Sequence, residues 1–158
     1  LGSPSEPTTK ALRKYLRKFL GDPRVVDINP WLWKIILNCF VLPFRPKKSA
    51  KLYARIWDGK SFPLITNTRD FTKNVRDELK KIDPKGYVEV NHAFLLSPPY
   101  VNEVYDRWEE DLKKGIGATK LLVIPMFPQY SESTIASGID ALAKELSKRV
   151  KIPEIIDI

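Results

Sequence analysis

The sequence predicts an α/β fold, a three-layer α/β/α arrangement with a parallel sheet, contained in one domain over residues 1–158. Two observations predict it. Apolar runs typical of strands occur at residues 87–96, 120–126 and 152–158, with helical patterns between them. Strands that alternate with helices at this spacing form a parallel sheet covered on both faces. A chain of 158 residues is also long enough to bury a sizeable core.

The first half of the chain is expected to be helical. The four helices expected there span residues 8–20, 31–42, 47–57 and 68–82. Thr8 or Thr9 can cap the first, whose apolar residues recur at helical spacing opposite a row of cations. The dipeptide Asn29-Pro30 begins the second, and Pro43 is expected to break it. Pro46 is expected to open the third.

The second half is expected to alternate strand and helix. One helix is expected over residues 100–114, and another begins at a cap, Ser131 or Ser133, and runs to Val150. In α/β folds, ligands bind beyond the carboxyl ends of the parallel strands. The ligand edge is therefore expected at residues 1–5, 94–99 and 127–133.

The positive charge of the chain is concentrated in its first 60 residues. The whole sequence holds 27 Lys and Arg against 19 Asp and Glu, and residues 1–60 hold 13 of those cations with only 4 of the acids. Such asymmetry favours an anionic partner, either nucleic acid, an acidic membrane surface or a ligand bearing carboxylate or phosphate. The basic and aromatic strand signature of common RNA-binding modules is missing, so no nucleic acid is expected. For any single lysine, a solvated helix face is the ordinary explanation.

An apolar segment with two tryptophans, residues 31–44, stands directly before a run of cations. It is too short to span a bilayer, and a lysine and a proline interrupt it. Such a helix suits either the membrane interface or the lip of a pocket for a flat apolar ligand. A core helix packed on the sheet is the competing interpretation. The residues assigned to this lip are Trp31, Trp33, Phe40 and Phe44.

Several chemistries are excluded by composition. One Cys and one His leave no disulfide framework and no zinc finger, and a reducing, cytoplasmic location is expected. His92 is interpreted as a structural histidine and Cys39 as a small hydrophobe, so no metal site is expected. Neither a Gly-rich phosphate loop nor a nucleophile elbow occurs. The start of the chain, Leu1-Gly2, has the character of the end of a strand that begins upstream.

Four segments match the motifs of a known family. They are LGSPSEPT at residues 1–8, YLRKFLGDPRVVD at 15–27, LPFRPKKSA at 42–50 followed by KLYARIW, and FPQYS at 127–131 followed by Ser133-Thr134. Together, in order and at these spacings, they resemble the N-terminal half of ferrochelatase. The combination of FRPKKSAKLY with PQYS and the following Ser-Thr makes the resemblance specific.

The resemblance implies a chelatase-like domain and a reaction. Ferrochelatases insert ferrous iron into a bent porphyrin held in a cleft between two similar α/β domains, as a part of heme biosynthesis. The His and Glu that handle metal and pyrrole protons lie in the C-terminal half, beyond this chain. No catalytic residue is therefore expected here, and His92 does not match the family's histidine. Ferrous iron and porphyrin are substrates, the missing C-terminal domain is a partner, and no cofactor is expected to be bound by this segment alone.

Six porphyrin-binding residues follow from the resemblance, position by position. Arg45 falls on the arginine that contacts a porphyrin carboxylate, and Tyr53 falls on the tyrosine of the following helix. Leu1 occupies the place that approaches the centre of the macrocycle. The remaining three, from the PQYS motif and the helix start behind it, are Tyr130, Ser131 and Ser133.

The chain departs from the family pattern at three places. Phe94-Leu95 replaces a pair that carries a cation and a polar ring in many members. The loop at residues 61–64 has a ring in place of a hydroxyl, and residues 135–137 replace a Thr-Gly-Ser sequence. A chelatase with weakened or altered metal handling is therefore expected. The alternatives are a non-catalytic porphyrin- or heme-binding homologue and a cobalt or nickel chelatase.

Overall fold

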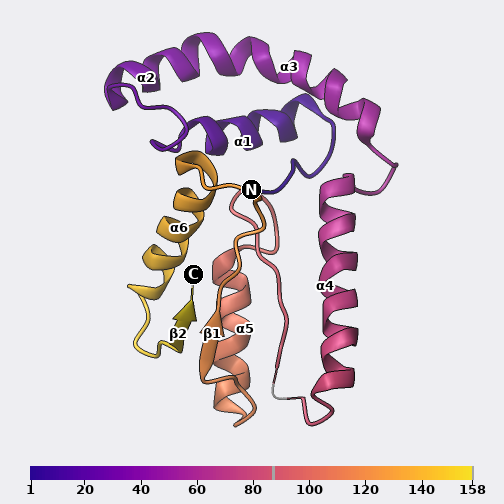
Figure 1. Ribbon diagram of the computed structural model, residues 1–158. Helices are drawn as coiled ribbons and strands as arrows, with labels where there is room; N and C mark the ends of the chain where they lie inside the picture. The colour runs from indigo at the N-terminus through magenta and orange to yellow at the C-terminus, as the bar shows by residue number, and fades with distance from the viewer. Residues whose placement is uncertain (87, 158) are drawn as a thin grey trace.

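The computed structural model describes residues 1–86 and 88–157. The α-helices are α1 (Thr9–Leu20), α2 (Pro30–Ile36), α3 (Leu42–Tyr53), α4 (Pro63–Ile82), α5 (Val101–Lys113) and α6 (Ser137–Leu146). Short helical turns of other pitch are η1 (Leu37–Val41), η2 (Ala54–Ile56) and η3 (Glu132–Ala136), and the strands are β1 (Lys120–Leu122) and β2 (Glu154–Asp157). Helices α1 to α3 form a layer at one end of the molecule, above the remaining elements (Figure 1).

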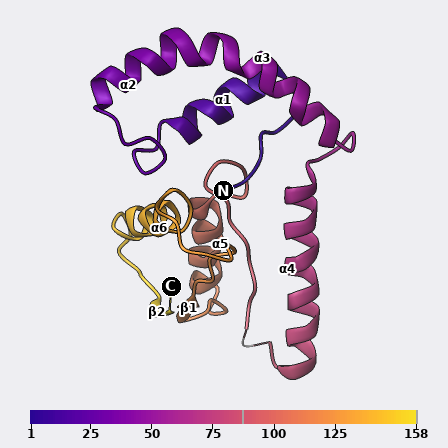
Figure 2. The same cartoon turned by 45° about the horizontal axis from the view of Figure 1, so that its top comes forward.

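The α1–α3 layer is built on the amphipathic pattern of α1. Thr8 caps α1 by accepting a hydrogen bond from the Ala11 amide at 3.2 Å, as expected. The apolar face of α1 packs against α2, η1 and α3, and Figure 2 shows α1 beside these helices. The buried residues of this upper core are Leu16, Leu20, Leu37 and Leu42. Burying that face leaves the cations of α1 on the solvent side.

The expected break at Pro43 is wrong, because α2, η1 and α3 follow one another without interruption (Figure 1). Pro43 lies in the first turn of α3, and η1 before it is a π-helical turn in which the Leu42 amide donates to the carbonyl of Leu37. Pro46 lies inside α3 instead of opening a helix. Its ring nitrogen cannot donate to the Leu42 carbonyl, and Arg13 Nε of α1 donates to that oxygen instead, at 3.3 Å.

Helix α4 is longer than its sequence pattern indicated. It begins at Pro63, five residues before the expected start, and ends at Ile82 as expected. Phe62, which precedes it, is 1% exposed and fixes the entry of the chain into the helix. The expected helix at residues 47–57 ends its α-helical part at Tyr53 and continues as η2.

The sheet is parallel and small. Strands β1 and β2 pair with Lys120 opposite Glu154 and Leu121 opposite Ile155, and both are shorter than expected. The expected strand at residues 87–96 is wrong for its described part: residues 88–93 pair with no strand, Phe94 forms an isolated bridge with Tyr100, and residues 95–96 lie in a bend. Tyr87 and Ile158, the outer ends of two expected strands, lie outside the described residues. The α/β class and the parallel pairing are confirmed.

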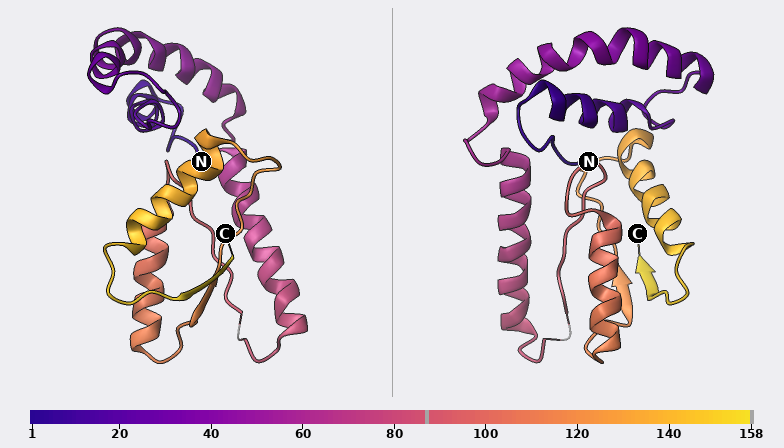
Figure 3. Two further views of the ribbon diagram at one scale, coloured as in Figure 1. Left: turned by 60° about the vertical axis from the view of Figure 1, so that its left-hand side comes forward. Right: turned by 180° about the vertical axis from the view of Figure 1, so that it is seen from behind.

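Helices α5 and α6 pack together beside the sheet. Tyr105, Leu142 and Leu146 form a lower core, with Trp108 and Leu121 packed against it. The expected helix from Ser131 or Ser133 to Val150 begins as the π-helical turn η3 and ends at Leu146. In the left view of Figure 3, α5 and α6 lie on one side of the extended chain and α4 on the other. Of the described helices, none has the length and apolar character needed to cross a bilayer.

Candidate functional site

Two of the three expected ligand loops meet directly at the N-terminus. The carbonyl of Leu1 accepts hydrogen bonds from the amides of Leu95 and Leu96 at 3.1 and 2.8 Å. The amide of Ser3 donates to Ser97 Oγ at 3.3 Å. Gly2 between them has φ +108°, and a Cβ there would lie 2.3 Å from Ser97 Oγ, so glycine is required.

A row of aromatic rings extends from these loops beneath α1 and α3. Tyr15 donates its hydroxyl hydrogen bond to the Gly2 carbonyl at 3.4 Å, and its ring lies 6.2 Å from that of Tyr53. Phe62 continues the row at 5.4 Å from Tyr53, and Trp57 lies 4.7 Å beyond Phe62. Burial raises the pKa of Tyr15, and the neighbouring Tyr53 raises it further. The Tyr15 hydroxyl therefore stays protonated, and the partly exposed rings of Tyr15, Tyr53 and Trp57 offer flat apolar surface.

A small hollow lies where this row meets the N-terminal loops. It encloses about 130 Å³, and its lining includes Ser3, Trp57, Phe62 and Ser97. Two rings and two hydroxyl groups thus face one space. Such a lining can hold part of a flat molecule and orient a polar substituent on it.

The third expected loop carries Tyr130, Ser131 and Ser133 at the start of η3. Tyr130 is 69% exposed, and the two serine hydroxyls lie 3.0 Å apart. The Ser131 carbonyl accepts the first amides of the helical turn, and no side chain caps that turn. A helix start of this kind favours anionic groups, although its amides are partly engaged.

Arg45 and Tyr53 lie on the same helix, α3, but in different surroundings. Arg45 is exposed and, within the described part of the chain, forms no ion pair. Tyr53 is half-buried in the aromatic row described above. The structure thus links Tyr53, through Tyr15, to the Gly2 carbonyl next to Leu1, and it brings Ser131 together with Ser133. Arg45 is joined to none of these residues by a hydrogen bond or ion pair in the described chain.

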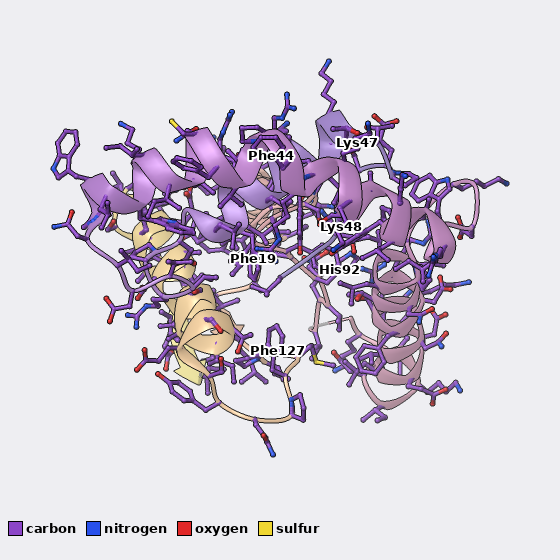
Figure 4. The ribbon with its side chains drawn as sticks, turned by 90° about the horizontal axis from the view of Figure 1, so that it is seen from above. Phe19, Phe44, Lys47, Lys48, His92 and Phe127 are labelled. Atoms are coloured by element: carbon purple, nitrogen blue, oxygen red, sulfur yellow. The ribbon has the colours of Figure 1, made fainter. Side chains whose placement is uncertain are left out.

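The expected lip residues divide into two kinds. Trp31, Phe40 and Phe44 are 76%, 66% and 73% exposed, and Figure 4 shows Phe44 on α3 with Lys47 and Lys48 nearby. Lys34 lies over the Trp31 ring at 5.8 Å. Trp33 differs because it is half-buried in the upper core and donates Nε1–H to the Leu20 carbonyl at 2.6 Å. Trp33 therefore fixes α2 on α1, whereas the side chains of the other three are open to solvent.

His92 has the surroundings of a structural residue. Its Nδ1 lies 3.0 Å from Thr72 Oγ1 of α4, and its ring meets Phe94 edge to face at 5.5 Å. Burial lowers the pKa of His92, and Arg107 and Arg76 lower it further. In the described chain, no three His, Cys, Asp or Glu side chains lie together to hold a metal ion. Cys39 is exposed rather than packed.

Phe94 and Leu95, the main departure from the family pattern, differ in burial. Phe94 is 6% exposed, and its amide donates to the Pro99 carbonyl at 2.8 Å. Leu95 is half-buried beside Leu1. Phe94 is thus a packing residue, and Leu95 is the member of the pair that can face a ligand.

Two features of the site escaped the sequence analysis. Tyr15 stood there in the apolar stripe of the first helix and at the start of a family motif, and neither pattern marks its hydroxyl. Arg24, in the loop after α1, forms a two-pronged ion pair with Asp140 of α6. The two residues are 116 positions apart, so no local pattern could link them.

These observations define an α/β protein in which the N-terminal loop and residues 94–99 meet under a helical layer, next to a row of aromatic rings. A profile of the family described as Ferrochelatase matches residues 1–158, and the chain belongs to the ferrochelatase family. It is 43% identical over 155 residues to a ferrochelatase of Idiomarina loihiensis and 39% identical over 154 residues to that of Marinobacter nauticus. It is also 39% identical over 153 residues to a coproporphyrin III ferrochelatase of Streptococcus mutans.

The matches cover nearly all of this chain but less than half of each relative. The shares are 98% of this chain and 41% of the Idiomarina protein, 98% and 40% for Marinobacter, and 97% and 46% for Streptococcus. The relatives are therefore more than twice as long as the matched region.

Proposed function

We propose that this chain forms one wall of a porphyrin cleft in a protein that inserts ferrous iron into a porphyrin during heme biosynthesis. The observation that carries the proposal is the family match over residues 1–158. The aromatic row and the joined N-terminal loops support it, because a flat apolar macrocycle needs such a surface. Residues 1–158 form one domain of the protein, with the three-layer arrangement completed in the whole molecule.

Each candidate residue has a chemical role in this proposal. Tyr53 and the partly exposed rings of Tyr15 and Trp57 contact the face of the macrocycle, and Leu1 approaches its centre. Ser131, Ser133 and the Tyr130 hydroxyl hydrogen-bond to its polar edge. Arg45, exposed on α3, binds a porphyrin carboxylate through two parallel N–H donors.

The chemistry itself is divided between two walls. Iron insertion needs the pyrrole protons removed by a positioned base, and family resemblance puts that base in the C-terminal half. This wall binds and orients the porphyrin and excludes water from its face. We propose that Leu95, which offers no donor or ligand atom, weakens delivery of ferrous iron without weakening porphyrin binding.

The test compares the complete protein that contains this chain with residues 1–158 alone. The complete protein is expected to insert ferrous iron into porphyrin, and residues 1–158 alone to give no turnover above background. Tyr53→Ala is expected to weaken porphyrin binding measured by fluorescence quenching, while Thr66→Ala on α4 serves as control. Porphyrin binding without metal insertion would instead support a non-catalytic homologue, and insertion of cobalt or nickel in preference to iron would support a different chelatase.

The role of Leu95 has its own measurement. Leu95→His in the complete protein is expected to lower the apparent KM for ferrous iron and leave the porphyrin affinity unchanged. The conservative variant Leu95→Met is the control for packing. Equal iron KM values in all three proteins would leave packing as the function of this position.

We further propose that the lip attaches this cytoplasmic protein to an anionic membrane surface. Trp31, Phe40 and Phe44 are exposed on one long helical segment, and the cations Lys34, Lys47 and Lys48 lie along it. Aromatic residues prefer the interfacial region of a bilayer, and nearby lysines add attraction to anionic lipid.

Vesicle co-sedimentation tests this attachment. Trp31→Ser with Phe40→Ser is expected to abolish binding to vesicles containing phosphatidylserine, and added salt is expected to weaken binding of the unchanged protein. Ile82→Ser, on α4 and equally open to solvent at 80% exposure, is the matched control. Binding that survives the double substitution would contradict the proposal.

A further inference from the structure

The ion pair between Arg24 and Asp140 joins two separately packed parts of the molecule. Arg24 lies in the loop between α1 and α2, and Asp140 lies in the first turns of α6. In Figures 1 and 3 this loop lies next to the upper end of α6. Arg24 Nη2 donates to Asp140 Oδ1 at 3.1 Å, and Arg24 Nε donates to the other carboxylate oxygen. Two parallel contacts fix the orientation of both groups as well as their distance.

Each end of the pair is attached to its own core. The loop of Arg24 is a turn in which the Asp22 carboxylate accepts the Arg24 amide at 2.9 Å. Val25 and Val26, which follow, pack on the upper core. On the other side, Leu142 belongs to the lower core two residues after Asp140. Movement of the α1–α3 layer relative to α6 must therefore break or strain this pair.

The pair also lies beside the loop that carries the candidate porphyrin residues. The hydrogen bond that Arg24 forms with Asp140 raises the pKa of Arg24, and the negative charges of Tyr130 and Glu132 would raise that pKa further. Tyr130 stands immediately before η3, and η3 leads directly into α6. Helix α6 thus follows the Tyr130–Ser133 loop directly and carries Asp140 in its first turns.

We propose that Arg24 and Asp140 are positioning residues that hold the α1–α3 lip over the Tyr130–Ser133 loop and so set how a porphyrin enters the cleft. The inference rests on the proposed function. The side chains are 38% and 57% exposed, so the pair adds little to the free energy of unfolding. Its role is to select one lip position rather than to stabilise the fold.

The kinetic test uses the complete protein and charge reversal. Arg24→Asp and Asp140→Arg are each expected to raise the porphyrin KM about two- to five-fold, the range of an exposed ion pair, with kcat and the iron KM unchanged. The double variant with both reversals is expected to restore the original porphyrin KM. Arg69→Asp, which breaks the exposed Arg69–Asp70 pair on α4, is the control. An unchanged porphyrin KM in the single variants, or no recovery in the double variant, would overturn the proposal.

A distance measurement separates failure of this inference from failure of the proposed function. Cys39 is exposed on η1 and offers a natural attachment site for a spin label on the lip. A second label at Lys144→Cys on α6 reports the separation of lip and α6, with any cysteines outside this chain replaced. Single reversals are expected to broaden the distance distribution and the double reversal to narrow it again. An unchanged distance distribution would overturn the proposed positioning role of Arg24 and Asp140, whether or not the protein inserts iron.

Discussion

The upper and lower parts of this molecule are stabilised by different interactions. The upper core packs aliphatic side chains of α1 against η1 and α3, and the cations around it stay on the solvent side. The lower core is enclosed by an ion-pair cluster in which Arg149 contacts Asp106, Glu109 and Glu145. Tyr105 and Trp108 there donate to backbone carbonyls at 2.6 Å each.

The difference indicates which part is open to a partner. In the lower part, acids and bases neutralise each other and serve the packing of α5 and α6. In the upper part, residues 1–60 hold nine more cations than acids, and the apolar side chains of the lip remain uncovered. An unbalanced charge beside an exposed apolar surface is the arrangement that an anionic, apolar partner requires.

The largest expected change in the free energy of unfolding comes from a substitution in the upper core. Leu16→Ala leaves a cavity between α1 and α3 and is expected to lower the free energy of unfolding by about 2–5 kcal/mol. Ile35→Ala, on the open side of α2, is expected to change it by less than about 0.5 kcal/mol. Denaturant unfolding followed by circular dichroism measures both. Similar losses in the two variants would show that the open face is in fact covered.

The next effect separates the two tryptophans. Trp33→Phe keeps a ring in the upper core but removes the N–H that bonds the Leu20 carbonyl, at an expected cost of about 1 kcal/mol. Trp31→Phe removes no such bond and is expected to leave thermal stability unchanged. Calorimetry measures the loss of thermal stability in each variant. Equal losses would mean that both tryptophans belong to the core.

A smaller change in the free energy of unfolding is expected from Arg13, whose side chain bonds the carbonyl that Pro46 leaves without a backbone donor in α3. Arg13→Met is expected to cost about 0.5 kcal/mol, because the Leu42 carbonyl loses its donor. In a Pro46→Ala background the backbone amide at position 46 can bond that carbonyl, so Arg13→Met is expected to cost nothing there. A double-mutant cycle in urea measures the difference. An equal cost of Arg13→Met in both backgrounds would remove this explanation.

The smallest expected effect is a pH dependence of stability that is confined to the lower part of the molecule. Hydrogen bonds from Lys148 and then Arg149 hold the pKa of Glu145 below its ordinary value of 4.5. The stability that this carboxylate contributes is therefore complete above that ordinary value and is lost as the pH falls through the lowered pKa. Hydrogen exchange is expected to show α6 losing protection in acid before α1. Glu145→Gln should flatten the pH dependence, and an unchanged slope in that variant would contradict the assignment.

Local chemistry was enough to predict the elements that depend on it. The threonine before α1 and Asn29 before α2 cap their helices by bonds to amides two or three residues away. The alternation of strands and helices in the second half follows from apolar periodicity, and the family motifs lie in continuous segments. None of these features requires knowledge of a distant part of the chain.

From the sequence alone, the α/β class, the caps of α1 and α2, the excess of cations in residues 1–60 and the family could be predicted, whereas the expected cap at Ser131 or Ser133 is wrong. The tertiary structure was needed to show that the helix continues through Pro43 and Pro46; at Pro46, the donor for the Leu42 carbonyl comes from α1. It also decided that Trp33 is buried while Trp31 is open, and that Arg24 meets Asp140. The physical reason is the same in each case. A hydrogen-bond or ion-pair partner that lies far along the chain leaves no local pattern and is fixed only when two packed parts meet.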